Sequence, residues 1–73
     1  MELLAERELP GYPGATVELQ TDGKRHAVSV KDQAGGKFLG QTESRLIAKD
    51  MYFHPFVYGY NYTNIERGEE DGS

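Results

Sequence analysis

The stretch from Met51 to Tyr62 constrains the fold of this chain most, because six of the eight aromatic residues lie in it. An aromatic ring buries roughly 150–250 Å², so this one segment supplies a large share of the apolar area open to so small a chain. After Pro55 the residues alternate, and the aromatic ones then share one face of an extended backbone: Phe56, Tyr58, Tyr60 and Tyr62. We therefore predict a β-strand here. It either packs centrally in the core or presents phenol rings to another molecule.

The chain has 73 residues, which is enough for one domain. A domain of this size buries only about 60% of the surface that its unfolded form exposes. The chain has no cysteine, which excludes disulfides and thiolate metal sites and fits a reducing compartment. No apolar run approaches the roughly 20 residues of a membrane span, and residues 1–7 lack the pattern of a signal peptide. We expect a soluble, cytoplasmic protein.

The negative charge lies at the two ends of the chain. Net charge is −4. Residues 15–65 hold six basic side chains against five acidic ones, whereas residues 1–14 hold three glutamates against one arginine and residues 66–73 hold four acids against one arginine. Acidic ends suit a basic protein partner better than a phosphate backbone, although they also serve solubility.

The N-terminal segment has two possible structures. Residues 2–9 are good helix formers with Leu3 and Leu4 on an apolar side, but they suit a short edge strand equally. The Pro-Gly-Tyr-Pro-Gly sequence of residues 10–14 then forces a turn. We assign residues 1–14 to an N-terminal arm and residues 15–65 to a small β domain. Residues 66–73 are acidic and Gly-rich, and we expect a disordered tail.

A hairpin is predicted next. Residues 15–20 and 24–31 alternate on either side of Asp22-Gly23, which is a favoured two-residue type I′ loop. This loop sets the following opposed pairs: Leu19 with His26, Val17 with Val28, and Ala15 with Val30. The apolar residues then fall on one face, so the turn and the pattern agree on the register.

The remaining segments complete a small sheet. Residues 32–36 read as a loop and residues 37–40 as a third strand. Residues 41–51 fit either a helix capped by Thr42 or Ser44, or a short strand at 45–49. Pro55 disfavours helical geometry at the residue before it and so ends what precedes it. The predicted class is mostly β: a small antiparallel sheet or SH3-like half-barrel of four to five short strands, with at most one short helix. The sequence of residues 13–19, a charged turn and residues 28–31 resembles the opening of SH3-like barrels.

The sequence offers little for catalysis or for a cofactor. His26 and His54 are the only histidines, and they lie at no known metal-ligand spacing. Ser29 and Ser44 have no nucleophile-elbow context. Gly35-Gly36-Lys37-Phe38 lacks the pattern of a phosphate-binding loop. We expect a non-enzymatic protein without metal or cofactor.

Protein binding agrees best with these features. Interfaces are enriched in tyrosine, and a core this small cannot bury all five tyrosines. The predicted anchors are Phe56, Tyr58 and Tyr60. The predicted charged contacts to a basic partner surface are Glu2, Glu6 and Glu8. We expect a monomer when the protein is free.

Two other functions remain open. One is binding of single-stranded nucleic acid, with bases stacking on the tyrosine strand beside Lys24, Arg25 and Lys31. Overall acidity counts against it, because such binding relies on counterion release. The other is a structural subunit of a larger assembly such as a virion, which predicts self-association.

The chain as a whole resembles a group of small acidic phage proteins. The features that carry the resemblance are a short charged start, Met1 to Glu8, and the acidic end Glu69-Glu70-Asp71, in a cysteine-free single domain. The group consists of phage-encoded proteins that bind bacterial RNA polymerase and block or redirect transcription. Its members share no residue motif, so no functional residue is carried over. The resemblance implies an inhibitor that occupies a basic, nucleic-acid-facing or regulatory surface of that enzyme.

Overall fold

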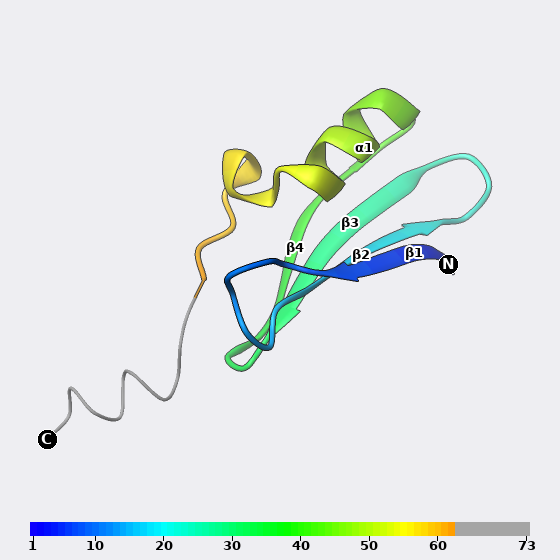
Figure 1. Ribbon diagram of the computed structural model, residues 1–73. Coiled ribbons are helices and arrows are strands. Elements are labelled where there is room, and N and C mark those ends of the chain that lie inside the picture. Colours follow the sequence, from blue (N-terminus) through cyan, green and yellow to red (C-terminus); the bar gives the residue numbers. More distant parts are fainter. Residues whose placement is uncertain (63–73) are drawn as a thin grey trace, which may run out of the picture.

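The computed structural model describes residues 1–62 as an antiparallel sheet followed by two short helices (Figure 1). The elements follow the chain in this order: β1 (Glu2–Glu8), β2 (Thr16–Thr21), β3 (His26–Asp32), β4 (Gly35–Thr42), the α-helix α1 (Arg45–Phe53) and the 3₁₀ helix η1 (Pro55–Tyr58). The four strands lie in the order β1-β2-β3-β4, so the sheet is open. The predicted mostly-β class is confirmed as an antiparallel sheet with one short α-helix. The predicted acidic tail, residues 66–73, lies outside the described residues.

The β2–β3 hairpin differs from its predicted register. Val17 pairs with Val30 and Leu19 with Val28, a shift of two positions. The cause is the carboxylate of Asp22, which accepts the backbone N–H groups of Lys24 and Arg25 at 2.9 and 2.8 Å. These bonds form a four-residue loop, residues 22–25, in place of the two-residue one. Because the shift is even, the apolar residues still share one face, as predicted.

Residues 2–9 follow the strand alternative. β1 pairs along β2 and is an edge of the sheet, with an irregularity between Leu3 and Ala5. The segment assigned to an N-terminal arm is therefore part of the sheet itself. Leu9, directly after β1, is buried in the core.

Residues 41–51 follow the helix alternative. The hydroxyl of Ser44 accepts the backbone N–H of Ile47 at 3.2 Å and caps α1. Ala48, Met51 and Tyr52 are the buried residues of the helix, and α1 packs on β2, β3 and β4. This spacing of three and four places them on one side of the helix, which faces the sheet.

The predicted aromatic strand is wrong, because no strand forms over residues 56–62. Pro55 begins η1 at a position where its missing N–H costs nothing. Gly59 ends that helix with φ +99°, a conformation that glycine adopts freely. The alternation of aromatic residues therefore falls on a helical turn and the chain after it.

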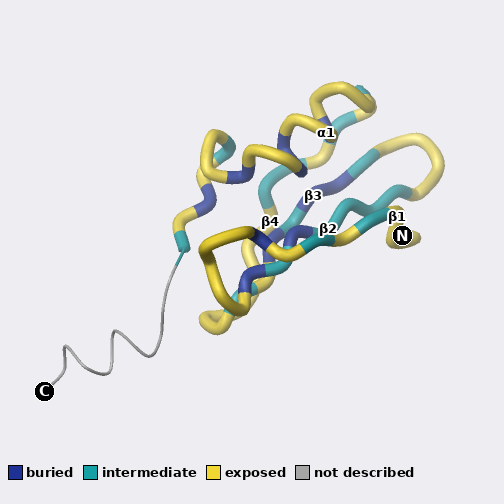
Figure 2. The backbone as a smooth tube through the Cα atoms, viewed as in Figure 1, coloured by how far each residue is buried: buried dark blue, intermediate teal, exposed yellow. Residues whose placement is uncertain are grey.

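The core lies between the sheet and the segment after it (Figure 2). Its buried members come from β2, β3, α1 and the flanking loops: Leu9, Ala15, Val17, Val28, Val30, Met51, Tyr52 and Tyr60. The opposite face of the sheet carries mostly polar side chains, including an ion pair between Lys31 and Glu18 at 3.4 Å. Within residues 1–62, only the helix side of the sheet is covered.

Candidate protein-binding surface

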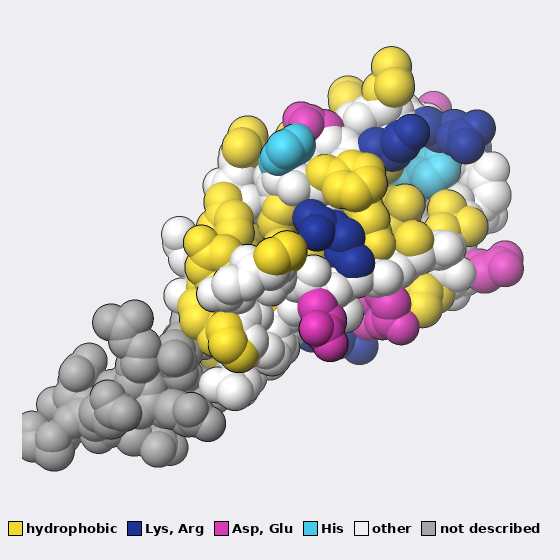
Figure 3. All heavy atoms as spheres, viewed as in Figure 1, with side chains coloured by type: hydrophobic (Ala, Val, Ile, Leu, Met, Phe, Trp, Pro, Cys, Tyr) yellow, Lys and Arg dark blue, Asp and Glu magenta, His cyan; other side chains and the backbone are white. Residues whose placement is uncertain are grey.

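The outward side of the two helices exposes large apolar side chains. Between 41% and 79% of each of the following residues is accessible, and we call them the helix surface: Leu46, Ile47, Phe53, Phe56 and Val57. They are exposed because the opposite side of α1 already fills the space above the sheet. Figure 3 shows hydrophobic side chains over this side of the molecule, with basic side chains among them and acidic ones on both the α1 and the β1 side.

An aromatic cluster adjoins the helix surface. The ring centroid of Tyr12 lies 4.9 Å from that of Phe56 and 5.1 Å from that of Tyr62. Phe56 in turn lies 5.2 Å from Tyr60. Tyr12 comes from the loop between β1 and β2 and was not among the predicted residues. The sequence feature that could have indicated Tyr12 is its position between two Pro-Gly pairs, because such turns hold a ring at the surface.

The three predicted aromatic anchors differ in accessibility. Phe56 is exposed and Tyr58 is half-buried, with its hydroxyl donating to Asp50 at 2.6 Å. Tyr60 is only 2% exposed and donates to Asp32 at 2.5 Å. Burial and the Asp32 carboxylate raise the pKa of the Tyr60 phenol. Tyr60 therefore belongs to the core, whereas Phe56, another of the predicted anchors, is exposed.

The three predicted acidic contacts do not share that surface. Glu6 pairs with Glu18 and Glu8 with Thr16, positions that alternate with the buried Val17. Their side chains therefore leave from the face of the sheet opposite α1. Glu2 lies at the other end of β1, roughly 20 Å along the strand from Glu8. The predicted acidic contacts and the exposed ring of Phe56 therefore lie on different parts of the surface.

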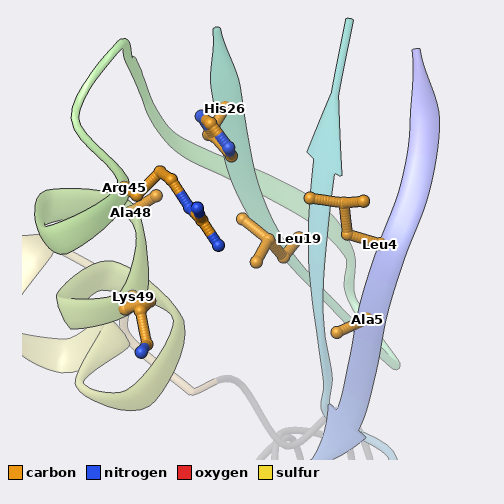
Figure 4. Close-up of a pocket in the computed structure, with 7 residues that line it drawn as sticks. All are labelled: Leu4, Ala5, Leu19, His26, Arg45, Ala48 and Lys49. Carbon is orange, nitrogen blue, oxygen red and sulfur yellow. The ribbon is translucent and has the colours of Figure 1, made fainter. Parts of the chain in front are cut away.

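A groove of about 260 Å³ lies between α1 and the β1 side of the sheet (Figure 4). It is lined by Leu4, Ala5, Leu19, His26, Arg45, Ala48 and Lys49. Strands and helix supply the apolar part, and Arg45 and Lys49 supply positive charge. The ion pairs within residues 1–62 involve neither of these two cations. Within residues 1–62, the buried Nδ1 atom of His26 has no hydrogen-bond partner.

Arg7 fixes the far end of α1 to the edge strand. Its guanidinium donates to the carbonyl oxygens of Tyr52 and Phe53 at 3.3 and 3.2 Å. It also lies 5.5 and 5.2 Å from the centres of the two aromatic rings. These contacts hold the helix at a fixed distance from β1 and so define the groove.

The described residues show neither a metal site nor a membrane-spanning helix. Residues 1–62 contain no cluster of three or more metal-ligating side chains. Neither helix in that range has the length and apolar character that a membrane span requires. No known protein family, curated protein or solved structure matches the chain.

Proposed function

We propose that this protein is a small non-enzymatic domain that binds a larger protein through the helix surface. The observation that carries the proposal is the exposure of five large apolar side chains on two consecutive helices. Single exposed apolar residues are ordinary, but five on two short consecutive helices of a small domain favour an interaction site. The adjoining aromatic cluster adds the residue types in which interfaces are enriched.

Bacterial RNA polymerase is the partner that we propose within this class, on the resemblance to small acidic phage inhibitors. In this version Glu6 and Glu8, which are exposed on β1, meet a basic surface of the enzyme. Complementary charge of this kind raises the rate of association. The apolar contact of the helix surface would supply the greater part of the affinity.

Binding of single-stranded nucleic acid gains no support from the geometry. That function relied on a strand of stacked tyrosines, and residues 56–62 form no strand. Lys24 and Arg25 lie in the β2–β3 loop, and Lys31 leaves from the face opposite α1. These charges do not line a common path with the tyrosines.

The test is a pull-down from a nuclease-treated bacterial lysate with the tagged full-length chain. The test variant is Leu46→Glu/Val57→Glu, at two highly exposed positions. Phe38→Glu is the matched control, because Phe38 is an exposed apolar residue that pairs with Ser29 on the other face of the sheet. We expect wild type and control to retain the same protein and the double variant to lose it. Equal recovery by all three chains would contradict the proposal, as would recovery of nucleic acid alone.

A further inference from the structure

The helix layer covers only part of the sheet. Four strands spaced about 4.8 Å apart make a face roughly 19 Å wide, whereas a helix with its side chains is about 10–12 Å across. α1 packs on β2, β3 and β4, and Arg7 is the residue of β1 that reaches it through hydrogen bonds. The helix side of β1 is therefore open beside α1, over a strip roughly 7–9 Å wide.

The groove at this place combines two kinds of chemistry. Its apolar part comes from Leu4 and Ala5 of β1, Leu19 of β2 and Ala48 of α1. Arg45 and Lys49 add two positive charges that are four positions apart, and therefore about 6 Å apart along the helix axis. Such a groove favours an apolar side chain that is flanked by carboxylates.

Within residues 1–62, no acidic side chain forms an ion pair with Arg45 or Lys49. Glu43 is paired with Arg25 at 3.9 Å, and Asp50 accepts the hydroxyl of Tyr58. Glu6 and Glu8 leave from the other face of β1, whereas Glu2 lies on the helix-side face opposite Thr21 and forms no ion pair within residues 1–62. The site therefore attracts negative charge from outside the described fold.

We propose that this groove receives an acidic amphipathic helix of the partner protein, an inference that rests on the proposed function. The partner helix lies along β1 beside α1 and inserts a leucine-sized side chain between Leu4 and Ala48. Carboxylates one helical turn apart pair with Arg45 and Lys49, as residues four positions apart share a helix face. The proposal thus names the chemistry of the partner at this site: apolar and acidic.

Two occupants from this chain itself fit less well. A second copy that packed α1 against α1 would bring Arg45 and Lys49 together with their own equivalents, which repel. The C-terminal sequence after Ile65 is acidic but contains only Gly, Glu, Asp, Arg and Ser. It has no large apolar side chain for the floor of the groove.

The test uses a displayed library of random peptides of ~16 residues, about four helical turns, selected on the immobilised full-length chain. We expect the selected peptides to combine leucine-type residues with glutamate or aspartate at helical spacing. Arg45→Glu/Lys49→Glu should weaken their binding about tenfold or more. Exchanging the peptide carboxylates for lysines should restore binding to that variant, as expected for a direct charge pair.

The matched control is Lys24→Glu/Lys37→Glu, which changes the net charge equally at two exposed positions outside the groove. Selected peptides that are basic, or that bind all variants equally, would overturn the proposal, and so would a selection without binders. If peptides bind only after Glu69→Gln/Glu70→Gln/Asp71→Asn, the chain's own tail is the occupant. Sedimentation that shows self-association lost in the Arg45/Lys49 variant would assign the groove to a second copy.

The same chains separate this inference from the proposed function. If lysate capture is lost in Leu46→Glu/Val57→Glu but kept in Arg45→Glu/Lys49→Glu, the protein-binding function holds and the groove proposal fails. Loss in both variants, with the Lys24/Lys37 control unchanged, supports both. Capture by all of the chains alike contradicts both.

Discussion

The guanidinium of Arg7 donates a hydrogen bond of 3.2 Å to the carbonyl oxygen of Phe53, which lies 46 positions later in the chain. α1 has no basic residue in its own last turn. A helix C-terminus carries partial negative charge and unpaired carbonyl groups, and a cation there is stabilising. The edge strand therefore supplies the C-terminal charge that the helix sequence lacks.

Replacing this arginine should destabilise the protein. We expect Arg7→Met to lower the free energy of unfolding by about 1–2 kcal/mol, through loss of the two carbonyl hydrogen bonds and the helix-end charge. Urea unfolding followed by circular dichroism measures the change. Arg25→Met is the control, because its 3.9 Å pair with Glu43 is exposed and should contribute less than about 1 kcal/mol. Equal effects of the two changes would refute the role given to Arg7.

The hydroxyl of Tyr60 should contribute to stability at neutral pH. Tyr60→Phe leaves the ring in the core but removes the 2.5 Å bond to the half-buried Asp32. We expect a loss of about 1–3 kcal/mol, because the Oδ2 atom of the charged Asp32 loses its donor while Oδ1 keeps the Ala34 N–H. Tyr12→Phe, whose ring is also in the aromatic cluster, is the control. Thermal unfolding of both variants at pH 7 decides; no difference between them would rule out a stabilising bond.

The same phenol should make stability depend on alkaline pH. Burial first, and then the Asp32 carboxylate, raise the pKa of Tyr60 above its ordinary value of 10.0. The stabilisation is complete below that ordinary value. It is lost as pH rises above it, because the unfolded state ionises first. Unfolding measured at pH 8 and in steps above pH 10 should therefore show a steeper decline for wild type than for Tyr60→Phe. Parallel declines would exclude this linkage.

The pKa of the Asp22 carboxyl should be lower than its ordinary value of 3.8. Backbone N–H groups of Arg25 and then Lys24 hydrogen-bond the ionised form and so favour it. The stabilisation is present above the ordinary value and is lost as pH falls below it. An NMR titration of the Asp22 side chain checks the shift. Asp22→Ala should speed amide exchange at Lys24 and Arg25, whereas Asp22→Asn should retain most of the protection.

Two glycines of β4 should respond differently to alanine. At Gly40 a new Cβ would lie 3.1 Å from the sulfur of Met51, whereas at Gly36 the nearest atom would be at 3.8 Å, which is ordinary contact. We expect Gly40→Ala to cost about 1 kcal/mol from crowding and Gly36→Ala to be neutral or slightly stabilising. Chemical denaturation of both variants gives the comparison. A Gly40→Ala protein as stable as Gly36→Ala would show that Met51 yields without cost.

Local patterns in the sequence predicted the sheet and its buried face, but not the loop or the last segment. Val17, Val28 and Val30 were assigned to one face because alternation along a strand is a local property. The predicted two-residue loop is wrong because the Asp22 carboxylate accepts two backbone N–H groups, which stabilises a four-residue loop over the type I′ turn. The aromatic alternation after Pro55 predicts a strand, although Pro55 and Gly59 are also start and stop signals for a short helix.

The sequence alone could not predict the groove, for a different reason. Arg45, Lys49 and Leu4 come together only because α1 docks over β2–β4 and leaves β1 open. That placement depends on Arg7 and Tyr52, which belong to segments far apart in the chain. Exposure of Leu46 and Val57 is likewise set by which side of each helix the core occupies.

The segment after η1 is attached to the domain in an unusual way. Within the described residues, no backbone hydrogen bond joins residues 59–62 to the sheet. The hydroxyls of Tyr60 and Tyr62 instead reach Asp32 and the carbonyl of Pro13. A segment secured by side chains rather than by a ladder can open locally at less cost than the sheet. We expect this segment to open while the four strands stay folded. Access to the core then depends on the hydrogen bonds of two phenol groups.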